Sequence, residues 1–393
     1  MNDRRASAAL LPAGAGPDWR ALAAEHGTPL LVLDCDRIRL QYRALARALP
    51  DVTLHYAIKA LPNADVVTTL ADEGCAFDLA TNGEVDMVED LGVDPRRCIH
   101  THPIKAPGDI RRALRYGCTT FVADNVDELD KFAPWRHRIA LLLRVSFPNA
   151  TARVDLSRKF GCAVDDLPAL LAAADARGLH VKGLSFHVGS QTDGPDAHVR
   201  AIARCAPLFR EARPGALAPL SALDIGGGFP ANYDGTVIGI EAFCAPLRTA
   251  LAALPASVRV LAEPGRFIAA PAMTCITAVV GRARRGDHLW YYLDDGVYGS
   301  FSGQIYDHTH CPLIPLDRVG EGHPSVLAGP TCDSIDVIAE DVLLPELQIG
   351  DLILAPMIGA YSSASATEFN SLPRTPILAL HAARRLDRAL RLA

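Results

Sequence analysis

The stretch Leu54–Ala80, LHYAIKALPNADVVTTLADEGCAFDLA, contains the unit whose repetition decides the fold. Two short β-rich runs, LHYAIK and AFDLA, flank ADVVTTLADEG, which is typical of a helix. The same rhythm continues through the β-rich runs CIHTHP, TTFVAD, IALLLRVS, VKGLSFHV, LSALDIGGG and SVRVLAEPG, with the helical stretches GEVDMVEDLG, DDLPALLAAADARG and IEAFCAPLRTALAAL among them. Eight alternations between residues 54 and 265 predict a closed (β/α)8 barrel and disfavour the alternative, an open doubly wound sheet.

The rhythm changes after Ile268, where strands follow one another with hardly a helix between them. The strand candidates are MTCITAVVGRARRG, HLWYYLDDGV, PSVLAGPTC, DLILAPMIGAY and TPILALH, which together predict a separate, mainly antiparallel β domain. The early run TPLLVLD, Thr28–Asp34, precedes the barrel and is expected to pair into that domain. The predicted division is a flexible tail at 1–16, the barrel at 37–268, and the β domain at 17–36 and 269–393.

Composition excludes several classes of function. Of the 393 residues 49% are apolar and 21% charged, as in an ordinary soluble enzyme, and the net charge of −6 leaves no basic footprint for nucleic acid. No window approaches the ~20 unbroken apolar residues of a membrane span. The ten cysteines form no CxxC pair, which argues against a zinc site or a disulfide framework and favours a reducing cytoplasm. The triplets His100–His102 and His308–His310 lack companion ligands, so no metal is expected.

Lys59 raises the question of function, because an ammonium at the end of an apolar strand is costly to bury. On local sequence the lysine either snorkels to water or serves as a nucleophilic amine that condenses with aldehydes. In a (β/α)8 barrel the chemistry lies at the carboxyl ends of the strands. Polar residues gather at those predicted ends: Lys59, Asp78, Arg144, His187, the DIGGG loop and the EPGR loop. This convergence favours the nucleophile.

Two further features of that mouth suggest a phosphorylated pyridine cofactor. Gly226–Gly228 let backbone N–H groups approach an anion, barrels often hold phosphate after strands seven and eight, and Arg266 can add charge-assisted hydrogen bonds. Glu263 is placed to face a pyridine nitrogen and keep it protonated, the alternative being an ion pair with Arg266. A phosphate cradle opposite an amine nucleophile predicts pyridoxal 5′-phosphate.

With these motifs assembled, the chain resembles the fold-type III pyridoxal-phosphate decarboxylases, and within them the ornithine decarboxylases. The resemblance runs from about Thr28 to Leu380 and is carried by YAIKA, FDLAT, GLSFHVGSQ, LDIGGGFP, AEPGRF, DGVYGSF, YDHTH, GPTCDSID and MIGAY. It implies an alanine racemase-like barrel with a β domain and a homodimer with shared active sites.

The resemblance also implies roles for individual residues. Lys59 looks like the lysine that forms a Schiff base with the cofactor, and Cys332 like the acid that protonates the substrate's α-carbon after carbon dioxide leaves. Asp307 and Asp333, with Tyr306, look like the residues that receive the substrate's distal ammonium. The stretch RVDLSRKFG, around Lys159, resembles a mobile loop near the site entrance. The remaining cofactor contacts are expected at Asp78, Arg144, His187, Ser190, Gly227, Gly228, Glu263, Pro264, Gly265, Arg266 and Tyr361.

The expected activity is decarboxylation of a basic L-amino acid, foremost L-ornithine to putrescine. Lysine decarboxylation, dual activity and a larger diamino acid remain open, because one methylene is worth only ~0.8 kcal/mol in a hydrophobic pocket. A racemase is disfavoured by Glu263, since racemases of this fold place arginine at the ring nitrogen. A non-catalytic regulatory homologue would be expected to lack Lys59, Cys332 or Asp307, and all three are present.

Overall fold

A computed structural model of the chain describes residues 16–149, 152–154, 156–211, 213 and 215–381. The tail predicted for residues 1–16 lies, apart from Gly16, outside these described residues. The chain divides into two units. One comprises Arg39–Pro230 and Val237–Phe267, and the other comprises the segments up to Ile38, Ala231–Thr236 and from Ile268 onward.

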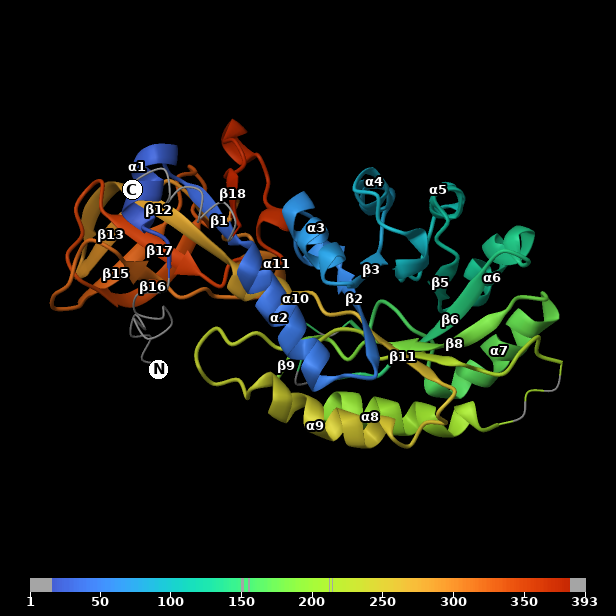
Figure 1. Cartoon of the computed structure of the whole chain (residues 1–393). Coiled ribbons are helices and arrows are strands. Elements are labelled where there is room, and N and C mark those ends of the chain that lie inside the picture. The colour runs from blue at the N-terminus through green and yellow to red at the C-terminus, as the bar shows by residue number, and fades with distance from the viewer. Residues whose placement is uncertain (1–15, 150–151, 155, 212, 214, 382–393) are drawn as a thin grey trace, which may run out of the picture. The chain divides into compact units, whose positions relative to one another are not determined.

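The first unit is built on a closed barrel of eight parallel strands, which confirms the predicted fold (Figure 1). In barrel order the strands are β2 (Val52–Ala57), β3 (Ala76–Leu79), β4 (Cys98–His100), β5 (Thr120–Ala123), β6 (Ala140–Val145), β8 (Val181–Phe186), β10 (Ala222–Asp224) and β11 (Arg259–Ala262). The interior is packed, not hollow: one layer consists of Ile99, Val122, Leu142, Ala222 and Leu261, each from a different strand. Such a layer is how an eight-stranded barrel fills its core.

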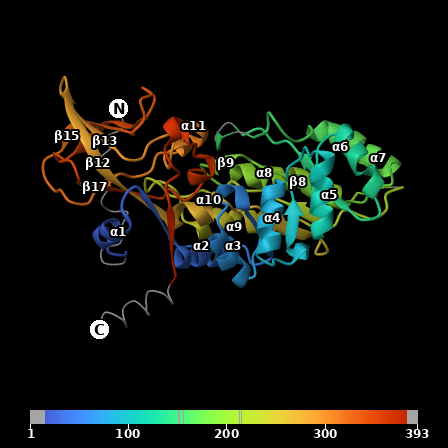
Figure 2. The same ribbon diagram turned by 90° about the horizontal axis from the view of Figure 1, so that it is seen from above.

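Helices follow the strands and pack in neighbouring pairs, α4 with α5, α6 with α7 and α8 with α9 (Figures 1 and 2). The helices of this unit are α2 (Cys35–Ala48, which begins in the other unit), α3 (Ala64–Asp72), α4 (Asn82–Asp90), α5 (Pro107–Tyr116), α6 (Val126–Phe132), α7 (Leu167–Ala176), α8 (Asp196–Cys205) and α9 (Ile240–Leu251). Several start at a polar cap in the loop that follows a strand. Asn63, Thr81 and Asn125 accept backbone N–H groups of the first turns of α3, α4 and α6. These caps give short βα loops and so fix the residues at the mouth.

The second unit is a mixed sheet that is mainly antiparallel, as predicted. Its strands are β1 (Leu30–Asp34), β12 (Met273–Arg285), β13 (His288–Leu293), β14 (Ile314–Pro315), β15 (His323–Ala328), β16 (Val337–Leu344), β17 (Leu352–Pro356) and β18 (Ile377–Leu380). The early strand β1 pairs antiparallel with β12 and parallel with β18, so the run predicted at Thr28–Asp34 contributes Leu30–Asp34 to this sheet. Strand β12 serves two parts of the sheet: its first half pairs with β1 and β17, and beyond an irregularity at Val279–Gly281 it pairs with β13.

The core of this second unit joins α1 (Trp19–His26) to the sheet. Leu22 of the helix packs with Leu30, Val32, Ile276 and Leu354. Two short helices complete the described elements: α10 (Arg266–Ala269), which lies where the two units meet in sequence, and α11 (Gly303–Asp307). Strands β7 (Ala152–Val154) and β9 (Ser190–Thr192) form a separate ribbon in the barrel unit. Within the described residues no helix has the length and apolar character needed to cross a bilayer.

Candidate active site

The barrel mouth holds Lys59 next to a buried carboxylate. Lys59 lies in a single 3-10 turn, Ile58–Ala60, directly after β2, and Asp78 belongs to the neighbouring strand β3. The Lys59 Nζ lies 2.6 Å from the Asp78 Oδ2. The lysine side chain is 39% exposed and the aspartate side chain is fully buried. Thr101, which follows β4, donates its hydroxyl to the other carboxylate oxygen of Asp78. The lysine is therefore held by the barrel at the mouth, with its amine partly accessible.

Two more carboxyl groups are buried at this mouth. Asp224 is in β10 and Glu263 directly follows β11, with exposed fractions of 0% and 6%. Burial raises the pKa of Asp224 to about 6. Burial, with the negative charges of Asp224 and Asp78, raises the pKa of Glu263 well above its ordinary value, although Lys59 opposes this. The site is therefore rich in buried carboxyl groups and suited to receive a cation beside Glu263.

His187 follows β8 and is held in its neutral form. The backbone N–H of Gly189 donates to its Nδ1 at 3.1 Å, so the hydrogen of the neutral ring resides on Nε2. Burial, followed by the positive charges of Arg144 and Lys59, lowers the pKa of His187 well below its ordinary value. A flat, uncharged imidazole beside Lys59 is suited to stacking on an aromatic ring.

The glycine loop after β10 is required by close packing. A side chain at Gly227 would place its Cβ 2.8 Å from the Glu263 carbonyl oxygen and 2.9 Å from the His187 Nε2. Gly226 and Gly228 adopt φ values of 65° and 99°, which favour glycine. The loop thus lies against the residues that follow two other barrel strands.

A cationic group lies at the same mouth, because Arg266 donates from Nη2 to the Ser190 hydroxyl at 3.0 Å. Arg266 is 4% exposed, at the start of α10. Pro264 of the same EPGR segment accepts the backbone N–H of Ala57, at 3.1 Å, and so joins the end of β11 to the end of β2. With Gly265 between them, these residues position Arg266 and Glu263 on one short loop.

Arg144 and the loop around Lys159 contact each other through Phe160. The Arg144 guanidinium lies 5.4 Å and the Lys159 ammonium 5.0 Å from the centre of the Phe160 ring. The edge of the His102 ring also packs on Phe160, with centroids 5.5 Å apart. Asp155 of this loop is outside the described residues. Phe160 therefore joins the predicted entrance loop to Arg144 in β6.

The remaining predicted site residues belong to the β unit. Cys332 is exposed, and its Sγ lies 3.5 Å from the Asn370 Nδ2. Asp333 accepts the Tyr298 hydroxyl at 2.6 Å, and this hydrogen bond lowers the pKa of Asp333. The ring of Tyr298 stacks on Phe369 at 4.3 Å. The thiol of Cys332 is thus at the surface of the β unit, and the carboxylate of the adjacent Asp333 is held by Tyr298.

Two more of the predicted residues are on α11. Tyr306 is 62% exposed and Asp307 is 8% exposed, and Thr309 donates its hydroxyl to the Asp307 Oδ2 at 3.3 Å. Tyr361 has a φ of 55°, and its carbonyl oxygen accepts the Ser365 hydroxyl at 3.0 Å. Left-handed backbone at a non-glycine residue is uncommon and frequent at functional sites.

The histidine triplets occupy ordinary structural positions. His100 is fully buried, and neither ring nitrogen has a hydrogen-bond partner within the described part of the chain. Burial lowers its pKa to about 3. His308 ends α11, and His310 contacts the Gln304 amide at 2.9 Å. The described residues contain no group of three or more His, Cys, Asp or Glu side chains that could hold a metal ion.

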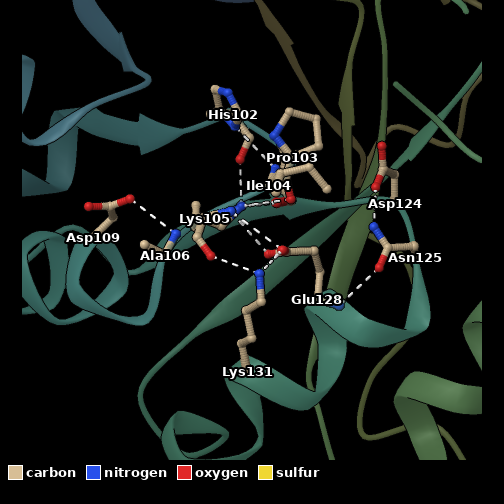
Figure 3. A network of polar contacts seen from close by, with 11 residues as sticks. His102, Pro103, Ile104, Lys105, Ala106, Asp109, Asp124, Asn125, Glu128 and Lys131 are labelled. Carbon is tan, nitrogen blue, oxygen red and sulfur yellow. Dashed lines mark hydrogen bonds and ion pairs between the residues drawn. The ribbon is translucent and has the colours of Figure 1, made fainter. Parts of the chain in front are cut away.

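Sequence reasoning did not select Asp224, Thr101 or Lys105. Asp224 lies two residues before the first glycine of the triplet, and Thr101 lies within CIHTHP. Both residues are therefore part of motifs that were singled out for other members. Lys105 is 2% exposed, and its Nζ donates to the carbonyl oxygens of His102, Pro103 and Val122, the last at 2.6 Å (Figure 3). It therefore fastens the loop after β4 to the end of β5.

The surroundings of Lys105 explain its altered acidity. Its backbone N–H donates to the Glu128 carboxylate at 3.3 Å, and its carbonyl accepts the Lys131 ammonium at 2.8 Å (Figure 3). Lys131 also pairs with Glu128. Burial lowers the pKa of Lys105 to about 7, an effect that Glu128 and Asp124 oppose.

This shift predicts a pH dependence of stability. Between about pH 7 and the unfolded pKa of about 10.4, the unfolded chain retains a proton on Lys105 that the folded chain has lost, so rising pH favours the folded state. In Lys105→Met this contribution is absent. Between about pH 7.5 and 9.5, we expect the free energy of unfolding of Lys105→Met to rise by roughly 1–2 kcal/mol less than that of the wild type. Urea titration at each pH measures this difference.

Lys131→Met serves as the control, because it removes another lysine of the same network while Lys105 stays in place. Identical pH dependence in wild type and Lys105→Met would contradict the assignment.

Comparisons with known proteins agree with one another. The sequence signature of the family described as pyridoxal-dependent decarboxylase, pyridoxal binding domain, matches residues 35–270. A lysine/ornithine decarboxylase of Selenomonas ruminantium is 38% identical over 360 residues, covering 91% of each chain. The ornithine decarboxylase of Schizosaccharomyces pombe is 37% identical over 357 residues, covering 86% of this chain and 81% of the relative.

Solved structures give the same result. The crystal structure of lysine/ornithine decarboxylase from Vibrio vulnificus complexed with putrescine has a TM-score of 0.88 and 52% sequence identity, over 92% of this chain and 97% of that chain. A second structure of that enzyme is complexed with cadaverine and matches equally well.

Proposed function

The chain belongs to the pyridoxal-dependent decarboxylases, and from this premise we propose that it converts L-ornithine to putrescine and carbon dioxide. The family and its relatives establish decarboxylation of a basic amino acid with pyridoxal 5′-phosphate as cofactor. The observation that carries the proposal for the site is the pair formed by Lys59 and Asp78 at the barrel mouth. The amine is held by a buried carboxylate, yet remains accessible.

The residues at this mouth fit the cofactor in charge and in shape. Asp78, Asp224 and Glu263 are buried carboxyl groups, and a protonated pyridine nitrogen would supply a cation beside them. At the glycine loop, a Cβ on Gly227 would collide with backbone and with His187, so the loop offers main chain at close range to an anion. Arg266 supplies a guanidinium to that anion, together with the Ser190 hydroxyl.

When bound, the cofactor supplies an electron sink for the negative charge left at the substrate's α-carbon by loss of carbon dioxide. Lys59 provides the amine that binds and releases the aldehyde carbon, and Asp78 orients that amine. Glu263 accepts the hydrogen of the ring nitrogen, which keeps the ring cationic. Neutral His187 stacks on one ring face.

We propose Ser190, Gly227, Gly228 and Arg266 of the barrel unit as the phosphate contacts, with Pro264 and Gly265 shaping the loop and Arg144 beside the ring. The contact predicted for Tyr361, which belongs to the β unit, stays a prediction.

Cys332 is proposed to return a proton to the substrate's α-carbon. A thiol can serve as a general acid when it reaches the reacting atom. Cys332 is exposed on the β unit, and the neighbouring Asp333 is held by the Tyr298 hydroxyl. This exposure supports a role for the thiol in an active site that a second subunit completes. Phe369, which stacks on Tyr298, is a partly exposed apolar side chain, and Ile335, two residues after Asp333, is another; both favour the same homodimer. A monomer in sedimentation equilibrium would contradict this arrangement.

The choice of ornithine rests on the residues proposed to receive the distal ammonium, which are Asp307 and Asp333, together with Tyr306. A buried cation needs a carboxylate partner, and Asp307 is a buried carboxylate. The Vibrio vulnificus relative has been crystallised with putrescine and with cadaverine, which supports a diamine product and keeps lysine as the second candidate substrate.

The test is release of carbon dioxide and amine from L-ornithine, L-lysine, L-arginine and meso-diaminopimelate, with and without added pyridoxal phosphate. Putrescine is expected as the main product, with kcat/KM for ornithine above that for lysine. Comparable putrescine and cadaverine formation would make the protein a dual enzyme. A cofactor-loaded protein that forms no amine from any of the four would contradict the proposed substrate class.

A further inference from the structure

Every carbonyl of the glycine triplet is held by a neighbouring donor. Gly226 accepts the Glu263 backbone N–H at 2.8 Å. Gly228 accepts both the backbone N–H and the hydroxyl of Thr192, at 3.3 and 3.1 Å. The carbonyl oxygen of Gly227, in the middle, lies 2.9 Å from the Nε2 of His198. These bonds fix the orientation of all three peptide groups.

The N–H groups of the same loop are arranged differently. Gly226 donates to the Asp224 Oδ1 at 2.9 Å. Within the described part of the chain, the N–H groups of Gly227 and Gly228 donate to no protein acceptor. Two adjacent backbone donors are therefore left for an anion, in an orientation that the bonds on the carbonyl side determine.

His198 is an unexpected residue for its position. It lies on α8, is fully buried, and packs among the aromatic rings of Phe186, Phe229 and Phe243 at centroid distances of 6.5, 5.5 and 5.8 Å. Burial lowers its pKa to about 4, so the ring is neutral near neutral pH. Because a carbonyl only accepts hydrogen bonds, the hydrogen lies on Nε2 and is donated to Gly227.

The other ring nitrogen argues against a packing role alone. The Nδ1 of His198 has no hydrogen-bond partner among the described residues. A buried nitrogen without a partner is unfavourable, and a phenylalanine would fill an aromatic pocket without that cost. The hydrogen bond from Nε2 to Gly227 is therefore the feature that distinguishes histidine from phenylalanine at this position.

The geometry assigns His198 as a positioning residue for the cofactor's phosphate, acting through the carbonyl of Gly227. The ring also lies against the neighbouring glycine, since a Cβ on Gly228 would be 3.4 Å from the His198 Cε1. By holding the carbonyl of Gly227, His198 fixes the planar peptide group that also carries the Gly228 N–H, and so keeps that N–H directed at the phosphate. This inference rests on the proposed cofactor site, because it requires the phosphate at the glycine loop.

The test compares pyridoxal phosphate with pyridoxal, which lacks the phosphate, in binding to the apoprotein. His198→Phe keeps an aromatic ring and removes the donor, whereas His198→Gln can place an amide N–H near the position of Nε2. We expect His198→Phe to raise the Kd for pyridoxal phosphate about tenfold while the Kd for pyridoxal changes less than about twofold. His198→Gln is expected to recover most of the loss.

The controls separate local from general effects. Equal weakening of both ligands in His198→Phe would indicate general damage to the site and overturn the inference, as would unchanged binding of both. Wild-type protein that binds pyridoxal as tightly as pyridoxal phosphate would overturn it too. Wild-type protein that prefers the phosphorylated ligand but releases no amine would contradict the proposed function alone, and the comparison of variants would still decide the role of His198.

Discussion

Lys59→Ala is expected to lower kcat/KM for ornithine decarboxylation by at least roughly 10³-fold, a loss of about 4 kcal/mol of transition-state stabilisation. The physical reason is that the amine at this position both binds the cofactor's aldehyde and releases the product from it. The measurement is carbon dioxide release at saturating pyridoxal phosphate, so that weakened cofactor binding does not account for the loss.

Lys59→Arg is the matched variant, because the alanine change also leaves Asp78 buried without its cation. Arginine retains a positive charge that can pair with Asp78, but at working pH it forms no covalent link with an aldehyde. The arginine variant should fold as stably as the wild type and be as inactive as the alanine variant. Activity above about a tenth of wild type in Lys59→Arg would show that the charge, not the nucleophile, is what the site requires.

The second large effect is expected for Glu263→Gln. Removing the carboxylate that holds the ring nitrogen in its protonated form should lower kcat by roughly 10²-fold or more. The change is measured with saturating cofactor and ornithine, which isolates the chemical step from binding.

The same substitution should not destabilise the protein. The pKa of Glu263 is raised by burial and by neighbouring carboxylates. In the protein without cofactor, where no ring nitrogen faces Glu263, the unfolded chain is ionised above its pKa of about 4.3 while the folded chain retains the proton. Glu263 then costs stability that grows with pH up to its folded pKa. Glutamine removes this cost. We expect the variant without added cofactor to be at least as stable as wild type at neutral pH, measured by urea titration.

Glu128→Gln is the control for Glu263→Gln, since it also replaces a buried carboxyl group of the barrel unit, on α6. Its contacts are with Lys131 and the backbone of Lys105, so kcat should change little. Equal losses of kcat in the two variants would contradict the assignment of Glu263 to the ring nitrogen.

The barrel strands could be predicted from the sequence because each has a short β-rich run followed by a polar or glycine-containing turn. The β domain was predicted less completely. Strand β16, Val337–Leu344, was missed because its VIAEDVLL pattern directly follows the GPTCDSID motif and mixes acidic residues with apolar ones. The short helix α11 was not predicted, since five residues give no helical periodicity.

The roles of the site residues could not be predicted from local sequence alone, because they depend on contacts between residues that are distant in the chain. Local sequence alone left Lys59 undecided between solvent and site, and only the convergence of the predicted strand ends favoured the site. The contact that holds the lysine there is with Asp78, 19 residues away in the chain. That contact arises from the pairing of neighbouring parallel strands, in which Ala57 is opposite Asp78. His198 gave no signal, because a lone histidine within a helix looks the same whether it packs in a core or holds a loop.

Borohydride reduction of the holoenzyme, followed by peptide mapping, tests most directly whether the barrel mouth is the active site. Reduction makes the reversible link between lysine and cofactor permanent, so the phosphopyridoxyl group remains on the residue that held it. We expect the label on the peptide that contains Lys59 and on no other lysine peptide. Label on a different lysine, or a holoenzyme that retains no label after reduction, would contradict the assignment of Lys59 and with it the proposed site.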